Sequence, residues 1–531
     1  MHQILIRLNS PYFTPDHETF RQAVRQFIDT EVAPFANEWE ANQQIPHSVW
    51  EKMGDLGFLG VNFPEEYGGT NNDFFYSVVL LEEIPRSLMG GFAAAHGVHQ
   101  FMSTAHILKA GSEYLKKKYV VDAITGKKLG ALAITEPFAG SDVMNIRTTA
   151  QRVGDKYIIN GSKIFITNGV YSDFVTVACK TDPSAGAAGI SLIVVDRNTP
   201  GFSATKLKKV GWHSSDTGEL AFDNVEVPVE NLVGKENHGF YYIMDSFQSE
   251  RLITAIGSLG ASEHGLALTL KYMNEREAFG RQLKKFQVLR HKLVDLATEI
   301  EATKQLVYYT AWLYDKGIYC VKECSMAKMK ATELSKRVSD ECLQFFGGYG
   351  YMDEFPISRM YRDARVGTIV GGTTEIMKEI LAKIIIDEVN FEPAYDNEKE
   401  LNPSQSANST NQSNTNQSQS MDIKPETAKD IIYSLPQRLK ADKAANANAI
   451  FQFDIEGPNG GQFTAKLENG VCTVSDGLNG TANCIIKAKD KDYEDVELGR
   501  TNAQMAVMMG KVKISNIGEM LKFIELFKRL G

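Results

Sequence analysis

Cysteine is scarce in this chain of 531 residues, which carries only six: Cys179, Cys320, Cys324, Cys342, Cys472 and Cys484. That density is far too low for a secreted scaffold held by disulfides, so we expect buried, reduced thiols. Cys320 and Cys324 lie four residues apart on an expected helix, where two thiols could bind a metal. No further Cys or His pair completes such a site, and no metal is predicted.

Long apolar runs and a large charge of one sign are also missing. No run approaches the roughly 20 residues that cross a bilayer, so no transmembrane segment is predicted. The net charge of −9 gives no electrostatic reason to bind nucleic acid. The N-terminus carries only a weak transit-peptide signal, and the final Lys-Arg-Leu-Gly is no peroxisomal address. We expect a soluble intracellular protein of the cytoplasm or mitochondrial matrix, with the peroxisome less favoured.

One segment lacks every charged, aromatic and large aliphatic side chain. Residues 402–420 contain only Asn, Pro, Ser, Gln, Ala and Thr. Such a composition cannot build a core, and it predicts a disordered linker over residues 391–420. As a random coil, the segment 402–420 would span roughly 25 Å. A separate domain is expected to follow over residues 421–531.

Hydrophobic periodicity divides the remaining chain into three parts. Residues 15–129 and 238–390 carry apolar side chains at helical spacings, and the second stretch is long enough for a bundle of four or five helices. Residues 130–237 are rich in β-branched side chains, and Asn160-Gly161 predicts a hairpin turn between two strands. Residues 421–531 combine a helix near 423–439, four strand-like runs and an amphipathic final helix, which indicates a small α/β domain.

Two long motifs carry the strongest signal. The run ALAITEPFAGSDV (131–143) ends an apolar strand with the hydroxyl of Thr135, and its Gly140-Ser141 turn can direct backbone N–H groups at a phosphate or a carbonyl. The run QFFGGYGYMDEFPISRMYRD (344–363) is the second motif. With FYYIMDSFQSERL (240–252) and GGTTEIMKEIL (371–381), they make residues 15–390 resemble the acyl-CoA dehydrogenases, the long-chain members above all.

The resemblance implies a fold, an activity and partners. The expected fold is an all-α N-terminal domain, a middle β-barrel domain and a C-terminal helical bundle. The implied activity is FAD-dependent dehydrogenation of fatty acyl-CoA to trans-2-enoyl-CoA in fatty acid β-oxidation. Electron-transfer flavoprotein would accept the electrons, and the protein would be a homotetramer or homodimer.

The resemblance also implies which residues hold the cofactor and the substrate. Phe165 stands where the family usually has Trp, while Phe138 and Asn145 replace residues that are usually smaller. Arg276 matches an Arg that meets the flavin pyrophosphate across a subunit interface. The implied flavin contacts are Leu132, Ile134, Thr135, Gly140, Ser141, Phe165, Thr167, Arg276, Phe279, Gln287, Gln344, Gly348, Thr373 and Glu375. The implied substrate contacts are Ser141, Arg251, Gly371 and Gly372.

The catalytic base does not stand at the position that most of the resembling family uses. Most family members carry a catalytic Glu where this chain has Gly371, and Gly cannot accept a proton. A minority place the Glu on an earlier helix before an Arg, which matches Glu250-Arg251. By spacing alone Glu250 could be a solvated helix acid, but with Gly at position 371 we predict that it is the base. Glu375 is expected to serve FAD binding.

The C-terminal segment resembles sterol carrier protein-2 domains, through FQFDIEGPNGGQFTAKLENG (451–470) and the run that begins DKDYEDVELG at residue 490. That resemblance implies a lipid or fatty acyl ligand in an apolar tunnel. The stripe Met505, Val507, Met508 and Met509 could line the tunnel or belong to the core. Two other functions stay open for the whole chain: an acyl-CoA oxidase that uses oxygen, and a non-catalytic lipid-binding scaffold.

Overall fold

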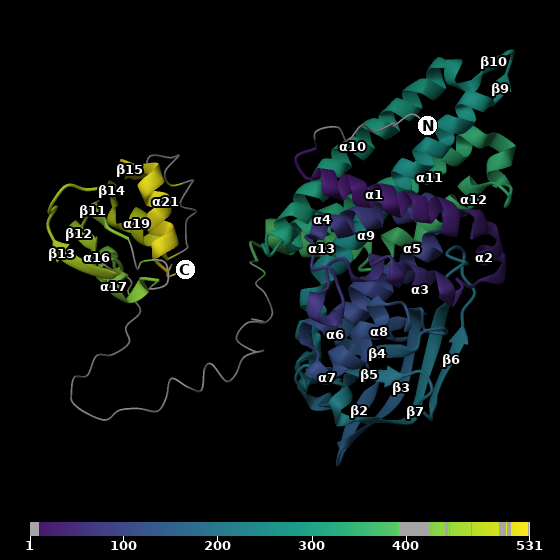
Figure 1. The fold of residues 1–531 in the computed structure, drawn as a ribbon, viewed down its shortest axis with the longest axis horizontal. Coiled ribbons are helices and arrows are strands. Elements are labelled where there is room, and N and C mark those ends of the chain that lie inside the picture. Colours follow the sequence, from purple (N-terminus) through teal and green to yellow (C-terminus); the bar gives the residue numbers. More distant parts are fainter. Residues whose placement is uncertain are drawn as a thin grey trace. The chain divides into compact units, whose positions relative to one another are not determined.

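The computed structural model describes residues 10–389, 391, 425, 427–440, 444, 447–468, 470–498, 506, 511–528 and 530. The chain divides into two compact units, Met1–Ser409 and Thr410–Gly531 (Figure 1). The predicted linker lies outside the described residues apart from Phe391, as does the stripe of Met505, Val507, Met508 and Met509.

The first part of the N-terminal unit is helical, as predicted. α1 begins with a capping box in which the Thr14 hydroxyl accepts from the His17 N–H and the His17 ring accepts from the Thr14 N–H. The helices of this part are α1 (Pro15–Phe27), α2 (Ala36–Asn42), α3 (His47–Asp55), α4 (Phe74–Glu83), α5 (Gly90–Gly97), the π-helical η6 (Val98–Ser103), α6 (Thr104–Ala110), α7 (Glu113–Leu115) and α8 (Val121–Ile124).

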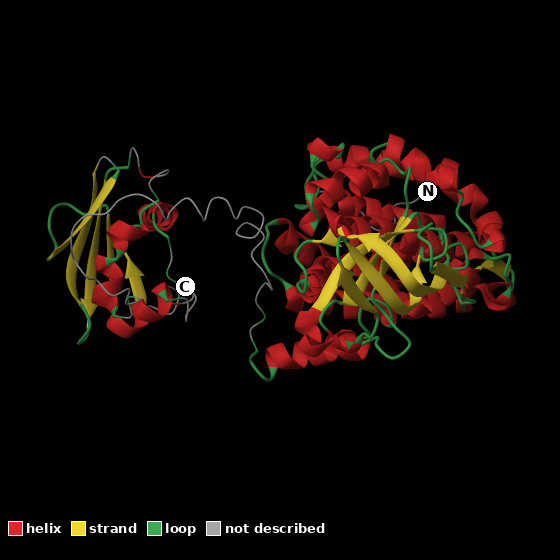
Figure 2. Ribbon diagram, turned by 90° about the horizontal axis from the view of Figure 1, so that it is seen from below, coloured by secondary structure: helices red, strands yellow, loops and turns green. Residues whose placement is uncertain are grey.

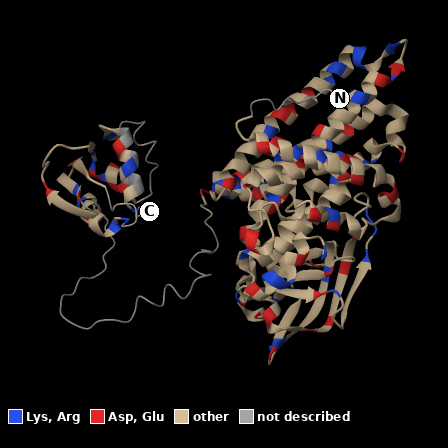
Figure 3. Ribbon diagram, viewed as in Figure 1, with Lys and Arg blue, Asp and Glu red and all other residues tan. Residues whose placement is uncertain are grey.

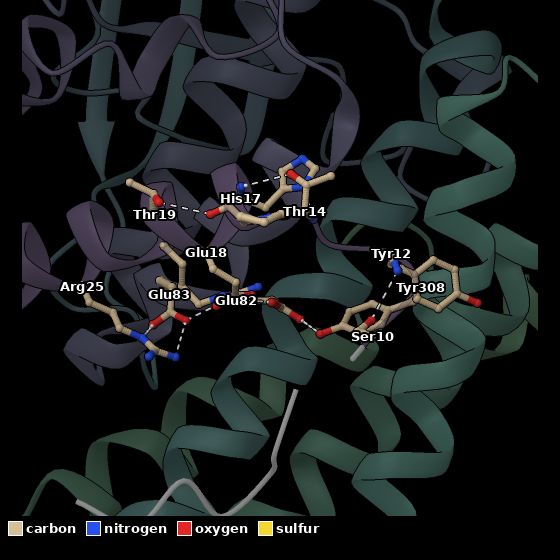
Figure 4. Close-up of polar contacts among 12 residues, drawn as sticks. Ser10, Tyr12, Thr14, His17, Glu18, Thr19, Arg25, Glu82, Glu83 and Tyr308 are labelled. Carbon is tan, nitrogen blue, oxygen red and sulfur yellow. Dashed lines mark hydrogen bonds and ion pairs between the residues drawn. The ribbon is translucent and has the colours of Figure 1, made fainter. Parts of the chain in front are cut away.

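A network of buried charges joins α1 to the helices behind it (Figure 4). The buried Arg21 guanidinium donates to Glu82 at 2.9 Å and to Glu83 at 3.0 Å, both on α4. Tyr308 of α10 (Gln287–Asp315) donates to Glu82 at 2.5 Å, and Arg25 donates to Glu83 at 2.8 Å. A buried charge is costly unless it is paired, so this network fixes α1 against α4 and α10.

The β-rich segment forms one sheet in the strand order β6-β7-β3-β2-β4-β5-β8, with β1 paired to β4. Its strands are β1 (Gly130–Ala133), β2 (Thr149–Val153), β3 (Lys156–Thr167), β4 (Phe174–Lys180), β5 (Ile190–Asp196), β6 (Phe202–Lys206), β7 (Thr217–Pro228) and β8 (Leu232–Val233). Among the described residues no pairing joins β6 to β8, so the predicted closed barrel is not confirmed. The end strand β8 has only two residues, too few to carry a ladder round to β6.

The hairpin predicted at Asn160-Gly161 is wrong. Both residues lie inside β3, where the pairing with β7 shifts register between Ile159 and Gly161. A Cβ on Gly161 would lie 2.6 Å from the Thr148 hydroxyl, so this glycine permits a close approach between strands. The turn between β2 and β3 instead uses Gly154, whose φ of +62° suits a tight hairpin.

The second helical part is the predicted bundle, and Figure 2 shows its helices and those before the sheet packed against the strands. The long helix α9 (Gly239–Glu275) ends at the short hairpin of β9 (Glu277–Ala278) and β10 (Arg281–Gln282). After α10 follow α11 (Val321–Phe346), α12 (Pro356–Ala364), the short η13 (Arg365–Thr368) and α13 (Thr374–Ile385). Acidic and basic residues are interspersed along the ribbon of these helices in Figure 3.

The C-terminal unit is the predicted small α/β domain with its own core. Its five strands run in the order β13-β12-β11-β14-β15, and β11 and β14 pair in parallel. The described elements are α16 (Ala428–Tyr433), α17 (Leu435–Arg438), β11 (Ala449–Glu456), β12 (Gly461–Glu468), β13 (Val471–Asp476), β14 (Cys484–Lys489), α19 (Asp490–Glu497), β15 (Val512–Ile514) and α21 (Ile517–Leu526). Phe451, Phe453, Phe463 and Phe523 are buried at the centre of this core.

All six cysteines are buried and free, as predicted, and the Cys320 and Cys324 sulfurs lie 3.6 Å apart. In the part of the chain that the structure describes, no cluster of His, Cys, Asp and Glu could hold a metal ion. No described helix has both the length and the apolar character that a membrane crossing needs.

Candidate active site

A cavity of about 1060 Å³ lies where the first helices, the sheet and the bundle of the N-terminal unit meet. Apolar side chains of α4, η6 and α9 form much of its wall, among them Leu81, Val98 and Ile253. The structure brings many of the predicted site residues to this cavity. Those that line it are Leu132, Ile134, Thr135, Gly140, Ser141, Phe165, Thr167, Glu250, Arg251, Gly371, Gly372 and Thr373.

The loop after β1 presents hydroxyl and backbone groups to the cavity. Thr135 follows the strand, and Ser141 follows the tight turn closed by mutual backbone hydrogen bonds of Glu136 and Ala139. A Cβ added to Gly140 would meet no atom within 4 Å, so the chain leaves open space at this point. The loop therefore offers short polar groups beside a space that a ligand could fill.

A buried ion pair fixes this loop to β3. Lys163, which is fully buried, donates to the Glu136 carboxylate at 2.7 Å and to the Ile134 carbonyl at 2.9 Å. Burial raises the pKa of the Glu136 carboxyl, but Lys163 and Thr148 outweigh that effect and leave the pKa below its usual value. Lys163 thus holds the residues on both sides of Thr135.

Farther along β3, the backbone is strained at Phe165. Its φ of +62° lies in the left-handed region that favours glycine, at a register shift between Lys163 and Ile166. Its ring is 66% exposed and lines the cavity, with Thr167 on the same wall. Strain that presents an aromatic ring to a cavity is typical of a ligand site, and a flat ring system could lie against it.

Glu250 lies in the N-terminal third of α9 and is only 5% exposed, which excludes a solvated helix acid. Its Oε1 atom has no hydrogen-bond partner in the described structure. Burial raises the pKa of the Glu250 carboxyl to about 8, although Arg251 and Lys109 act to lower it. A dry carboxyl whose pKa lies near neutrality, at a cavity wall, is suited to take up a proton.

Arg251, the neighbour of Glu250, is also buried. Its guanidinium lies over the Phe247 ring at 5.6 Å, and Nη1 lies 3.5 Å from the Ser325 hydroxyl of α11. Its Nε atom has no partner among the described residues. Arg251 therefore supplies positive charge beside Glu250 without forming a close ion pair with it.

The Gly371-Gly372 turn closes the cavity near Glu250. Both glycines have left-handed backbones, with φ values of +62° and +87°. A Cβ on Gly371 would lie 3.7 Å from the Thr254 hydroxyl, which itself donates to the Glu250 carbonyl at 2.8 Å. Position 371 thus lies beside the helical turn that carries Glu250, so a carboxylate from either place could serve one cavity.

The remaining predicted flavin contacts do not line this cavity. Phe279 is 96% exposed in the turn between β9 and β10, and Arg276 immediately precedes β9 (Figure 1). The Arg276 guanidinium lies over the Tyr349 ring at 5.7 Å, next to the predicted Gly348. The exposed residues of this second set are Arg276, Phe279, Gln287, Gln344 and Gly348. Glu375 is also exposed, in the first turn of α13.

Small residues extend the cavity along α9 and the end of α5. A Cβ added to Gly257 would meet nothing within 4 Å, and one added to Gly97 would meet only Ile253 at 3.9 Å. Both glycines line the cavity. The resulting apolar extension has room for a hydrocarbon chain.

Sequence reasoning missed the buried charges that hold the cavity loops. Besides the pair of Lys163 and Glu136, Asp363 of α12 accepts from the Gly90 N–H at 2.9 Å and from the Trp212 N–H at 2.6 Å. Lys328 of α11 donates to the Gly372 carbonyl at 2.5 Å. One sequence signal could have revealed these buried charges. Each charged residue lies at a position where the spacing of the surrounding apolar residues predicts the buried face of a helix or strand.

Comparison with known families accounts for nearly all of the described chain. The N-terminal domain of acyl-CoA dehydrogenases matches residues 14–127, the middle domain matches 131–225 and the C-terminal domain matches 237–386. The SCP-2 sterol transfer family matches residues 429–528.

Individual proteins agree with the family models. The mitochondrial long-chain specific acyl-CoA dehydrogenase of Sus scrofa is 41% identical over 377 residues, which cover 70% of this chain and 87% of the relative. The crystal structure of acyl-CoA dehydrogenase from Geobacillus kaustophilus is 44% identical with a TM-score of 0.68, and the match covers 71% of this chain and 100% of that one.

A glutaryl-CoA dehydrogenase of Mycobacterium smegmatis, solved in complex with FADH2, is 27% identical with a TM-score of 0.68. That match covers 72% of this chain and 98% of the other. The three domain matches follow one another in chain order and together account for the cavity and its walls. The chain therefore belongs to the acyl-CoA dehydrogenase family, and it carries a C-terminal domain of the SCP-2 sterol transfer family.

Proposed function

We propose that the protein dehydrogenates fatty acyl-CoA to the trans-2-enoyl thioester, with Glu250 as the base. The observation that carries this proposal is the buried Glu250 carboxyl, which lacks a partner at Oε1 and faces an apolar cavity. Position 371 is the nearest alternative place for a catalytic carboxylate beside the cavity, and the Gly at that position has no side chain to supply one. The family relationship and the long-chain relative support a fatty acyl substrate.

The residues at the cavity fit an FAD ring. Phe165 offers an aromatic face, and Thr135, Ser141 and Thr167 offer hydroxyls at the edge of the same space. When bound, FAD supplies the acceptor for the β-hydride. The chain's own residues would orient the ring, exclude water from it and hold the thioester against it.

Glu250 would take the α-proton of the bound thioester. As the Cα–H bond breaks, negative charge develops on the thioester oxygen and must be stabilised. The Gly371-Gly372 turn and Arg251 provide backbone dipoles and positive charge near this place. The pKa of Glu250, raised by burial, makes the carboxylate a stronger base than a solvated one.

We further propose that the second set of flavin residues completes the site of another copy of this chain. Arg276, Phe279 and Gln287 are exposed at the bundle tip and do not line the cavity of their own chain. The planar Arg276 guanidinium suits a pyrophosphate, which supports a homodimer or a larger symmetric assembly. Electron-transfer flavoprotein is the proposed acceptor of the electrons, in preference to oxygen.

Glu250→Gln should slow flavin reduction by long-chain acyl-CoA by roughly 10²–10⁴-fold, because the amide keeps the size of the side chain and cannot accept the proton. Anaerobic stopped-flow absorbance measures the rate. Glu375→Gln is the matched control, since Glu375 is exposed and does not line the cavity; it should keep its reduction rate once it is saturated with FAD. A near-normal rate in Glu250→Gln would place the base elsewhere.

The reaction should also depend on pH through Glu250. Its raised pKa means that the carboxylate, the reactive form, becomes dominant only as the pH rises through about 8. Because kcat/KM reports the free enzyme, it should rise about tenfold per unit as the pH increases toward this value. Steady-state assays across pH 6–10 test this; a profile already flat from pH 6 would show that Glu250 ionises normally.

Arg276→Ala should weaken FAD retention, because a phosphate would lose a charge-assisted hydrogen bond worth about 1.5–3 kcal/mol. The flavin absorbance that remains after gel filtration measures this loss. Arg152→Ala removes an exposed Arg from the sheet and serves as the control, with full FAD content expected. Equal FAD content in both variants would contradict the proposed role of Arg276.

The SCP-2 domain is proposed to bind a lipid or fatty acyl ligand and to be dispensable for the chemistry. Its separate core predicts that cleavage within residues 402–420 leaves turnover of soluble acyl-CoA within about twofold, since a tether alters local concentration without building the site. The isolated residues 421–531 should bind a fluorescent fatty acid. Loss of turnover with FAD still bound would show that the two units share a site.

A further inference from the structure

Lys328 is a buried cation of α11 that contacts the Gly371-Gly372 turn without lining the cavity itself. Its side chain is 0% exposed, and its ammonium donates to the Gly372 carbonyl at 2.5 Å. The described residues place no carboxylate in an ion pair with it. A charged group buried without a counter-charge is costly, and a neutral donor would satisfy the same carbonyl more cheaply.

The turn that Lys328 holds needs an external support. Two successive glycines with left-handed backbones have wide conformational freedom, so the sequence alone does not fix this turn. On one side, the Thr373 hydroxyl accepts from the Ile376 N–H and caps α13. On the other side, the hydrogen bond from Lys328 anchors the turn to α11.

The direction of that hydrogen bond orients the next peptide group. A trans peptide is planar, with its N–H opposite its C=O. Because the Gly372 carbonyl points to Lys328, the Thr373 N–H points away from α11. Gly371, Gly372 and Thr373 all line the cavity, so the turn presents its backbone there in a fixed geometry. An ammonium on the carbonyl also polarises the same amide and strengthens its N–H as a donor.

Lys328 adds charge as well as position. Burial and, to a smaller extent, the nearby Arg251 lower its pKa to about 8. Lys328 and Arg251 are thus two buried basic side chains close to this wall of the cavity. Glu375 and Glu333 act in the opposite direction. Positive charge at this wall would stabilise the negative charge that develops on a thioester oxygen when the α-proton leaves.

We propose that Lys328 is a positioning residue for proton abstraction: it holds the Gly371-Gly372 turn and makes the α-proton of the bound thioester more acidic. This inference rests on the proposed function. Lys328 touches neither the substrate nor the flavin in this proposal; it acts through the turn and through its charge.

The test uses FAD-loaded full-length protein and a long-chain 3-thia-acyl-CoA. This analogue has an acidic α-C–H bond but no hydrogen on sulfur to transfer, so its proton passes to the base and no electrons reach the flavin. The enolate that remains gives a long-wavelength charge-transfer band with oxidised flavin. Titrating this band against pH gives the apparent pKa of the bound analogue, a readout of acidity that is separate from turnover.

Lys328→Met keeps the length and apolar stem of the side chain and removes its charge. We expect the apparent pKa of the bound analogue to rise by about one unit and kcat with acyl-CoA to fall about tenfold, with KM nearly unchanged. This loss is smaller than the roughly 10²–10³-fold typical of removing a direct oxyanion donor, because Lys328 acts through the turn. Lys330→Met removes an exposed lysine two residues away and should match wild type.

Lys328→Arg, which keeps the charge, should recover most of the analogue acidity. The inference is overturned if Lys328→Met binds FAD and shows wild-type acidity and kcat, or if only KM changes. It is equally overturned if neither variant folds by circular dichroism, because the role would then be structural alone. If wild type itself gives no charge-transfer band, the proposed function fails instead.

Discussion

The exclusion of water from one carboxyl group is the constraint on which the site depends. Glu250 lies on the N-terminal third of α9, and no single element could shield it. The first helices, the sheet and the bundle each supply one part of the surrounding cavity wall. The same burial that raises the pKa of Glu250 also makes the ionised form costly, so the positive charges of Arg251 and Lys109 are needed nearby.

Buried charges that bind backbone groups recur around this cavity. Lys163 holds the carbonyl of Ile134, Lys328 holds that of Gly372, and Asp363 accepts from two backbone N–H groups. Lys163 and Lys328 each fix a loop that has no regular secondary structure to order it, and Asp363 joins the first residue of α5 to the loop at Trp212. In a low-dielectric interior such bonds are strong when satisfied, which suits loops that must keep their geometry as charge moves in the site.

The sequence predicted the order of domains and many of the residues at the cavity, because long motifs fix both. Glu250 was predicted to be the base because Gly371 carries no carboxylate and because Glu250 directly precedes Arg251. The burial of the Glu250 side chain agrees with that prediction. The turn at Asn160-Gly161 was mispredicted because the dipeptide signal cannot distinguish a hairpin from a bulge inside a long strand. Lys328 escaped prediction because a lysine on a helix is usually solvated, and only tertiary packing reveals that this one is not.

Exchange of the α-hydrogen with solvent tests the central claim most directly, since it separates proton removal from hydride transfer. The FAD-loaded protein is incubated in D2O with a long-chain acyl-CoA that carries two β-methyl groups and so has no β-hydrogen to lose, and the thioester is examined by mass spectrometry. If Glu250 is the base, the wild type and Glu375→Gln should incorporate deuterium at the α-carbon, and Glu250→Gln should not. Deuterium uptake at the wild-type rate in Glu250→Gln would contradict the account.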